Sequence, residues 1–145
     1  MEFKKIKDTY YLRIDKDEKI VETIRKMCRQ ERIQAGYFQG IGACSTVIIS
    51  TYIPENNDFI DHNFTGMIEM ISLMGNITTE GNGEPFLHSH AVFSYLDENR
   101  GIKVVAGHLK EAEIRYTGEI VLTPAEEKIG RMFDTKTNID VWKLS

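Results

Sequence analysis

The chain has 145 residues, of which 41% are hydrophobic and 28% are charged, and its formal net charge at pH 7 is −4. This length supports a single domain, residues 1–145, with one hydrophobic core, and the ordinary composition excludes a disordered or fibrous protein. Because the net charge is negative, the composition does not suggest a basic surface for the phosphate backbone of nucleic acid. This argues against a domain that binds DNA mainly by charge.

The first residues, MEFKKIKDTYYLRI, lack the apolar stretch of a signal peptide, and no later run approaches the length of a membrane span. We therefore expect a cytoplasmic protein with no membrane partner. The two cysteines, Cys28 and Cys44, are expected to be buried free thiols in a reducing compartment rather than a disulfide.

The first predicted element is a helix from about Lys16 to Gln34, which ends near Gly36. Asp15 and Glu18 have the spacing of a capping box at its start. Five apolar residues then recur at helical intervals: Ile20, Val21, Ile24, Met27 and Cys28. Such a helix has one apolar face and should pack on a sheet.

From Gly36 onward, short β-rich runs alternate with turn segments rich in Gly, Pro, Asn and Asp. The predicted strands are Tyr37 to Ile41, Thr46 to Ile53, Phe59 to Phe64, Met67 to Ile77, His88 to Leu96, Ile102 to His108 and Ile114 to Leu122. Two further candidates, Arg131 to Asp134 and Ile139 to Leu144, would close the chain. The predicted fold class is α+β, a mainly antiparallel sheet packed with one long N-terminal helix.

Three of the four histidines lie in two consecutive predicted strands. His88 and His90 are two residues apart, so their side chains point to the same face of a strand. A hairpin with a symmetric turn near Asn99 pairs residues whose numbers sum to about 198, and 90 + 108 = 198. His90 should therefore face His108, and all three imidazoles should converge.

Three imidazoles suit Zn²⁺, Ni²⁺, Fe²⁺ or Cu²⁺, and a zinc ion held by three protein ligands keeps a fourth, exchangeable position. The alternative is that these histidines merely alternate with apolar residues on a solvated strand face. His62 stands apart and is interpreted as a surface or interface residue.

Glu69 is an acid within the otherwise apolar segment GMIEMISLMG. Because Glu is rarely buried without a partner, this residue is a candidate for a metal ligand, a general acid or base, or an interface contact. An outward-facing position on the strand explains it equally well.

Several motifs in order resemble the PPC domain family, which occurs in plants and prokaryotes. The resemblance covers nearly the whole chain and rests on GYFQGIGACSTVIIS, GMIEMISLMGNI, GEPFLHSHAVFS, VVAGHL and IRYTGEIVL. It implies a homotrimer of compact α+β domains. It also implies that His88, His90 and His108 bind a divalent metal ion, with zinc as the leading candidate.

Plant members of this family bind DNA through an attached Arg-Gly-Arg-Pro hook, which this sequence lacks. They also carry an arginine in their protein-contact segment where this chain has Met67. The resemblance therefore implies a DNA-binding or regulatory module with at best weak DNA contacts, or one with a protein partner.

The fold also resembles that of acetolactate decarboxylase, a zinc enzyme. That likeness implies an alternative function, a small metalloenzyme that acts on an oxoacid-like metabolite bound at the metal. Glu69 or Glu119 would then carry the proton. A third alternative is a structural trimer with incidental histidines.

Overall fold

An N-terminal hairpin precedes the helix, and the sequence analysis did not predict it. In the computed structural model, which describes residues 1–145, β1 (Glu2–Ile6) pairs antiparallel with β2 (Thr9–Asp15). Tyr10, Leu12 and Ile14 are buried while the residues between them are exposed. This period of two was the available signal for a strand.

The predicted long N-terminal helix is wrong in both length and position. Helix α1 (Ile20–Glu31) has 12 residues and follows two strands. Asp15 belongs to β2, and the connector after it is bound to the sheet, because the Asp17 N–H donates to the Ile114 carbonyl at 2.8 Å. At the other end, Arg32 adopts the left-handed conformation and stops the helix before Gly36.

The expected capping box does not cap the helix. The Glu18 carboxylate accepts the Asp15 N–H at 2.8 Å, but both residues lie before the first helical turn. Instead, the helix N-terminus is capped by Glu111, whose two carboxylate oxygens accept the N–H groups of Val21 and Glu22 at 2.8 and 3.1 Å. A tertiary contact has thus replaced a local one.

Four long strands follow the helix: β3 (Gly36–Ile53), β4 (Asp58–Thr79), β5 (Pro85–Leu96) and β6 (Ile102–Pro124). Three of them each merge two of the shorter predicted runs. In β3 the register shifts between Gly40 and Gly42 and again between Cys44 and Thr46. Such bulges interrupt the alternation of side chains without ending the strand.

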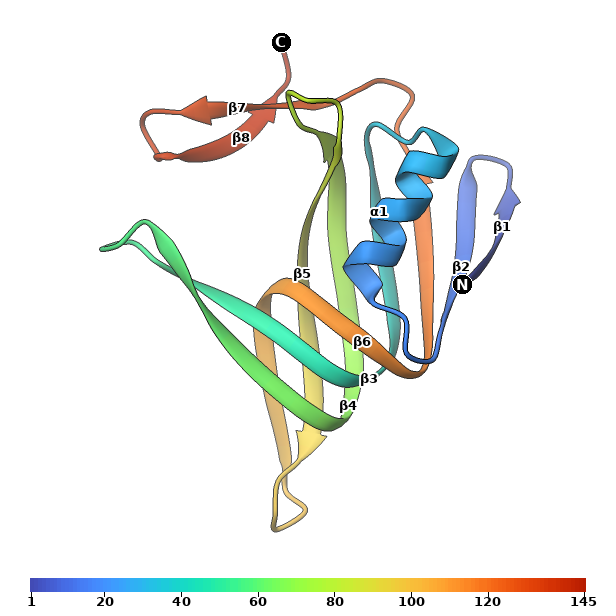
Figure 1. Ribbon diagram of the computed structural model, residues 1–145, viewed down its shortest axis with the longest axis vertical. Helices are drawn as coiled ribbons and strands as arrows, with labels where there is room; N and C mark the ends of the chain where they lie inside the picture. The colour runs from blue at the N-terminus through green and yellow to red at the C-terminus, as the bar shows by residue number, and fades with distance from the viewer.

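These four strands pair in a closed circuit, in which β3 lies between β4 and β6 while β5 also pairs with β4 and β6. All of these pairings are antiparallel, and β2 adds to the outer edge of β6. Helix α1 lies against one face of this sheet (Figure 1). Its buried residues are Ile20, Val21, Thr23, Ile24, Met27 and Cys28, and all of them except Thr23 belong to a core cluster of 25 hydrophobic residues.

The C-terminal hairpin consists of β7 (Gly130–Asp134) and β8 (Ile139–Lys143), close to the two predicted closing strands. It joins the sheet through one parallel pair, Thr79 with Gly130, and projects from the upper end of the molecule (Figure 1). Trp142 is 44% exposed on this hairpin and therefore lies outside the core.

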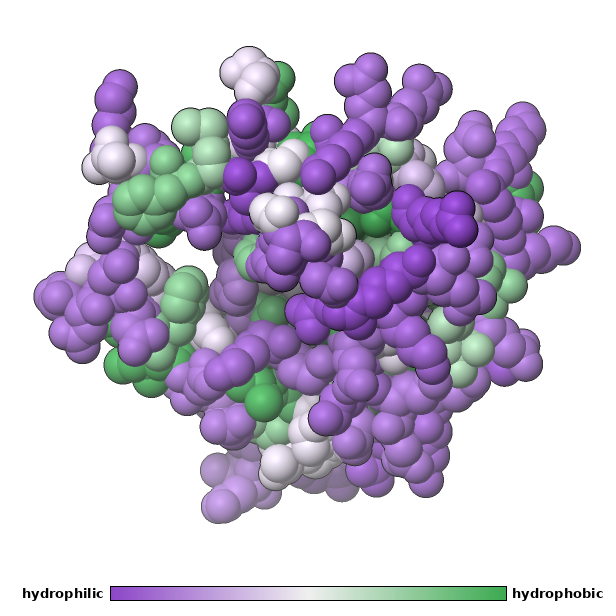
Figure 2. Space-filling view, turned by 45° about the horizontal axis from the view of Figure 1, so that its top comes forward, coloured by the Kyte–Doolittle hydropathy of each residue, from purple (hydrophilic) through white to green (hydrophobic).

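Both cysteines are buried free thiols, as expected. The only helix is too short to cross a membrane. On the face drawn in Figure 2, hydrophilic side chains predominate and hydrophobic ones lie between them in small groups.

Candidate metal centre

Strands β5 and β6 bring three histidines to one face of the sheet. His90 is directly paired with His108, as the symmetric hairpin predicted, and His88 lies two residues before His90 on β5. The ring centroids are 5.2 Å apart for His88 and His90, 5.1 Å for His88 and His108, and 5.4 Å for His90 and His108. Each ring therefore neighbours the other two.

One donor nitrogen from each of the three imidazoles lies within 4.8 Å of the other two. A tetrahedral zinc ion with bonds of about 2.0–2.1 Å needs donors roughly 3.4 Å apart, so the rings need to close by no more than about 1.4 Å. Small side-chain rotations accomplish this without moving the strands. The residues present therefore fit a metal ion.

Burial favours the form of the imidazole that binds metals. His88 and His108 are half-buried, and His90 is exposed. Burial is the main cause that lowers the pKa of both His88 and His108, and the neighbouring imidazoles lower it further. Neutral imidazole is the ligand form, so these rings need little deprotonation to bind an ion.

One polar atom beside the cluster lacks a partner. Asn76 on β4 is paired with His88, and its Oδ1 is buried without a hydrogen bond. A metal-bound histidine ordinarily donates its second ring N–H to an acceptor of this kind. This orphaned acceptor is a second observation that fits a metal centre.

The sequence analysis missed the groups on the other side of His108. Ser50 on β3 is paired with His108, and its hydroxyl donates to Asp61 Oδ1 at 2.7 Å. Lys110 forms an ion pair with the same carboxylate, and these two contacts hold the pKa of Asp61 below its usual range. The Phe59 ring lies 5.4 Å from the His108 ring. Only the tertiary pairing of the strands brings these residues together.

The two predicted carboxylate candidates lie apart from the histidines. Glu69 is exposed on β4 and is paired with Ala43, and Glu119 is exposed on β6 and is paired with Arg13 and Ile41. Both line one shallow depression of about 380 Å³. Neither belongs to the three-histidine group, and neither does His62, which is exposed and paired with Ile49.

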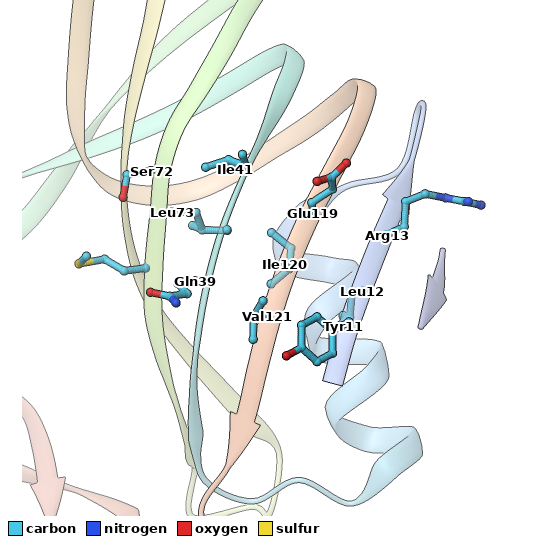
Figure 3. Close-up of a pocket in the computed structure, with 12 residues that line it drawn as sticks. Tyr11, Leu12, Arg13, Gln39, Ile41, Ser72, Leu73, Glu119, Ile120 and Val121 are labelled. Carbon is cyan, nitrogen blue, oxygen red and sulfur yellow. The ribbon is translucent and has the colours of Figure 1, made fainter. Parts of the chain in front are cut away.

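A second depression, of about 630 Å³, lies on the face of the sheet opposite α1. Tyr11, Val121 and Gln39 cross it on neighbouring strands, as Figure 3 shows. The same row continues through Met74, which is paired with Gln39, to His90, which is paired with Met74. Tyr11, Ile41 and Met74 are 49%, 57% and 60% exposed, so this face is open and apolar.

Solved structures share the fold over almost the whole chain. A protein of Bacteroides thetaiotaomicron named a "putative DNA binding protein" is 26% identical with a TM-score of 0.88, and the match covers 98% of this chain and 96% of that one. A metal-containing protein of Archaeoglobus fulgidus is 27% identical with a TM-score of 0.82 and the same coverage. A plant- and prokaryote-conserved (PPC) protein of Pyrococcus horikoshii is 29% identical with a TM-score of 0.80, covering 98% of this chain and 93% of that one.

The predicted likeness to acetolactate decarboxylase is confirmed at the level of the fold. The enzyme from Bacillus subtilis is 17% identical with a TM-score of 0.52, and the match covers 88% of this chain and 57% of the enzyme. No curated protein matches the chain by sequence.

The profile of the Plants and Prokaryotes Conserved (PCC) domain matches residues 1–126, which include all three histidines and every element up to the end of β6. The C-terminal hairpin lies outside this match. Since the matched segment spans most of the chain, the protein belongs to the plants and prokaryotes conserved domain family, the PPC family of the sequence analysis.

Proposed function

We propose that this protein is a homotrimeric PPC module that binds a divalent metal ion, zinc, through His88, His90 and His108. The observation that carries the proposal is the convergence of three imidazoles from two paired strands. The relative described as metal-containing supports it. Free buried thiols agree with action in the cytoplasm, where cysteines stay reduced.

The ligand set favours zinc and leaves the ion reactive. Imidazole nitrogens suit zinc, and three protein ligands leave at least one position for water or another molecule. When bound, the ion supplies a Lewis acid that polarises an oxygen ligand. His90 is exposed, so an incoming molecule approaches the ion from its side of the site.

The open apolar face supports assembly into a trimer. A contiguous group of large apolar side chains on a surface marks a contact with another molecule more often than single exposed ones do. The row from Tyr11 to Met74 lies in the open depression on this sheet face, and it leads to His90. A second copy of the chain packed on this face would cover these residues and border the metal.

The names of the relatives support a DNA-binding role, whereas the charge of this chain does not. The Bacteroides protein is named for DNA binding. A trimer of this chain carries about three times the net charge of −4, which repels DNA over most of its surface. We expect weak, salt-sensitive DNA contact and a larger part for a protein partner or a small ligand.

The alternative function is a metalloenzyme that acts as a lyase on an oxoacid-like metabolite. The open position on the ion favours it. Glu69 and Glu119 are the candidate proton carriers, and both would need to reach a substrate that extends from the ion. An enzyme must turn over such a compound in its metal-loaded form, whereas the module only binds it.

Elemental analysis of untagged protein tests the metal proposal. Wild type should hold about one ion per chain, the His88/His90/His108 triple alanine variant should hold none, and His62→Ala should match wild type. Equal metal content in wild type and the triple variant would refute this ligand set.

The oligomeric state needs a separate measurement. Light scattering at micromolar concentration should give the mass of a trimer, and the mass of a monomer would refute the proposed assembly.

A further inference from the structure

The metal face carries a cation that the family match does not include. Arg131 is the second residue of β7, in the C-terminal hairpin. We propose that Arg131 and the metal ion together bind a small dicarboxylate, with one carboxylate on the ion and the other on the guanidinium. This inference rests on the metal site of the proposed function and names its ligand class.

The hairpin places Arg131 beside the histidines. Gly130 is paired with Thr79, the last residue of β4, and the Arg131 guanidinium carbon lies 4.2 Å from the centre of the Phe86 ring. Phe86 and His88 are two residues apart on β5 and point to the same face, about 6.6 Å apart along the strand.

The guanidinium is held in place, but no acid neutralises it. One of its nitrogens donates to the Asp140 carbonyl at 2.6 Å, and the Phe86 ring supports its face. None of the ion pairs in the structure involves Arg131. A guanidinium has five N–H donors in a planar fork that matches a carboxylate, and four remain free here.

The charge around the site favours a dianion. A divalent ion on three neutral imidazoles adds two positive charges to the one on Arg131. The Asp61 carboxylate is already paired with Lys110, and Glu80 and Asp140, which line a depression together with Arg131, form no ion pair with it. Phe86 and His88 are about 6.6 Å apart along β5, so a guanidinium over Phe86 and an ion on His88 would call for two carboxylates rather than one, and a four-carbon dicarboxylate is the probe we choose. On the far side, the Phe59 ring presents an apolar wall beside His108.

The alternative is that Arg131 only fastens the hairpin to Phe86. A methionine at this position keeps the apolar packing but removes the charge. Arg115 offers a matched control, because its guanidinium also lies over an aromatic ring, that of Tyr116 at 5.7 Å. Both Arg115 and Tyr116 are exposed, and neither belongs to the metal site.

The test is isothermal titration of the zinc-loaded protein with succinate and with acetate. Wild type should bind succinate more tightly than acetate. Arg131→Met should weaken succinate binding roughly tenfold or more, the size expected for a charge-assisted pair, and should change acetate binding less than threefold. Arg131→Lys should recover part of the succinate affinity, and Arg115→Met should match wild type.

Metal content, measured before each titration, separates the two proposals. Wild type without zinc would refute the metal site itself. Zinc-loaded wild type that binds succinate no better than acetate, or an Arg131→Met variant with full metal and unchanged succinate affinity, would overturn the role of Arg131. If Arg131→Met loses succinate affinity and Arg131→Lys restores none of it, Arg131 only holds the hairpin in place, and this result would also overturn its role as a ligand-binding residue.

Discussion

The cap of α1 by Glu111 provides a sharp test of how the sheet positions the helix. The Glu111 carboxylate accepts the N–H groups of Val21 and Glu22, which have no other partner in the first helical turn. Replacing Glu111 with Ala removes both bonds and leaves these donors to water. Loss of a cap costs about 1 kcal/mol, and a bond to a charged acceptor costs more, so the total is about 2 kcal/mol.

For a chain of this size, such a loss lowers the unfolding midpoint by roughly 5–8 °C. Calorimetry or thermal circular dichroism measures the change. Glu126→Ala is the control, because Glu126 is an exposed acid just after β6 whose carboxylate forms no hydrogen bond or ion pair. An unchanged midpoint in Glu111→Ala would refute the capping role.

The pH dependence supplies a second readout. Burial raises the pKa of Glu111 above its ordinary value of 4.5, although the capping N–H groups oppose this shift. A carboxyl with a raised pKa binds its proton more tightly in the folded state, so its contribution to stability falls as the pH rises through the folded pKa. Relative to Glu111→Gln, wild type should therefore lose free energy of unfolding between pH 4.5 and neutral pH. A gain over that range would contradict the burial argument.

Two substitutions and one chemical reaction test the packing of the core. Gly75→Ala should destabilise the fold by about 1–3 kcal/mol in chemical unfolding, because its new Cβ would collide with the Phe38 ring and lie 2.8 Å from the His88 carbonyl oxygen; a neutral effect would show that both neighbours move aside. Thr78→Val should raise the free energy of unfolding by about 1 kcal/mol, since the Thr78 hydroxyl is fully buried without a partner, and a loss of stability would reveal a hidden bond. Cys28 and Cys44, whose pKa burial raises to about 12, should resist alkylation at pH 8 until the protein unfolds; fast reaction of the native protein would place them nearer the surface.

Local patterns in the sequence were enough to predict the convergence of the three histidines. The pairing of His90 with His108 followed from strand periodicity and the position of one turn, because a hairpin is a short-range structure. The apolar face of α1 followed from its 3.6-residue period for the same reason.

Longer-range features were decided by tertiary contacts. The start of α1 depended on Glu111, which is about 90 residues away in sequence. The strands β3 and β4 each continue through register shifts at positions where the sequence pattern predicted two separate strands. The placement of Asp61 and Phe59 near His108 required β3 to lie between β4 and β6.

The position of Arg131 shows this division most clearly. Its strand was predicted from local alternation, but nothing in that pattern relates it to Phe86 or His88, more than 40 residues earlier. The sequence by itself determined which residues form the β5–β6 hairpin, the C-terminal hairpin and the three-histidine cluster, since residues close together in the chain meet in a hairpin wherever the distant strands lie. Only the tertiary structure decided which cation, carboxylate and ring surround that cluster, because those contacts depend on how distant strands share one sheet.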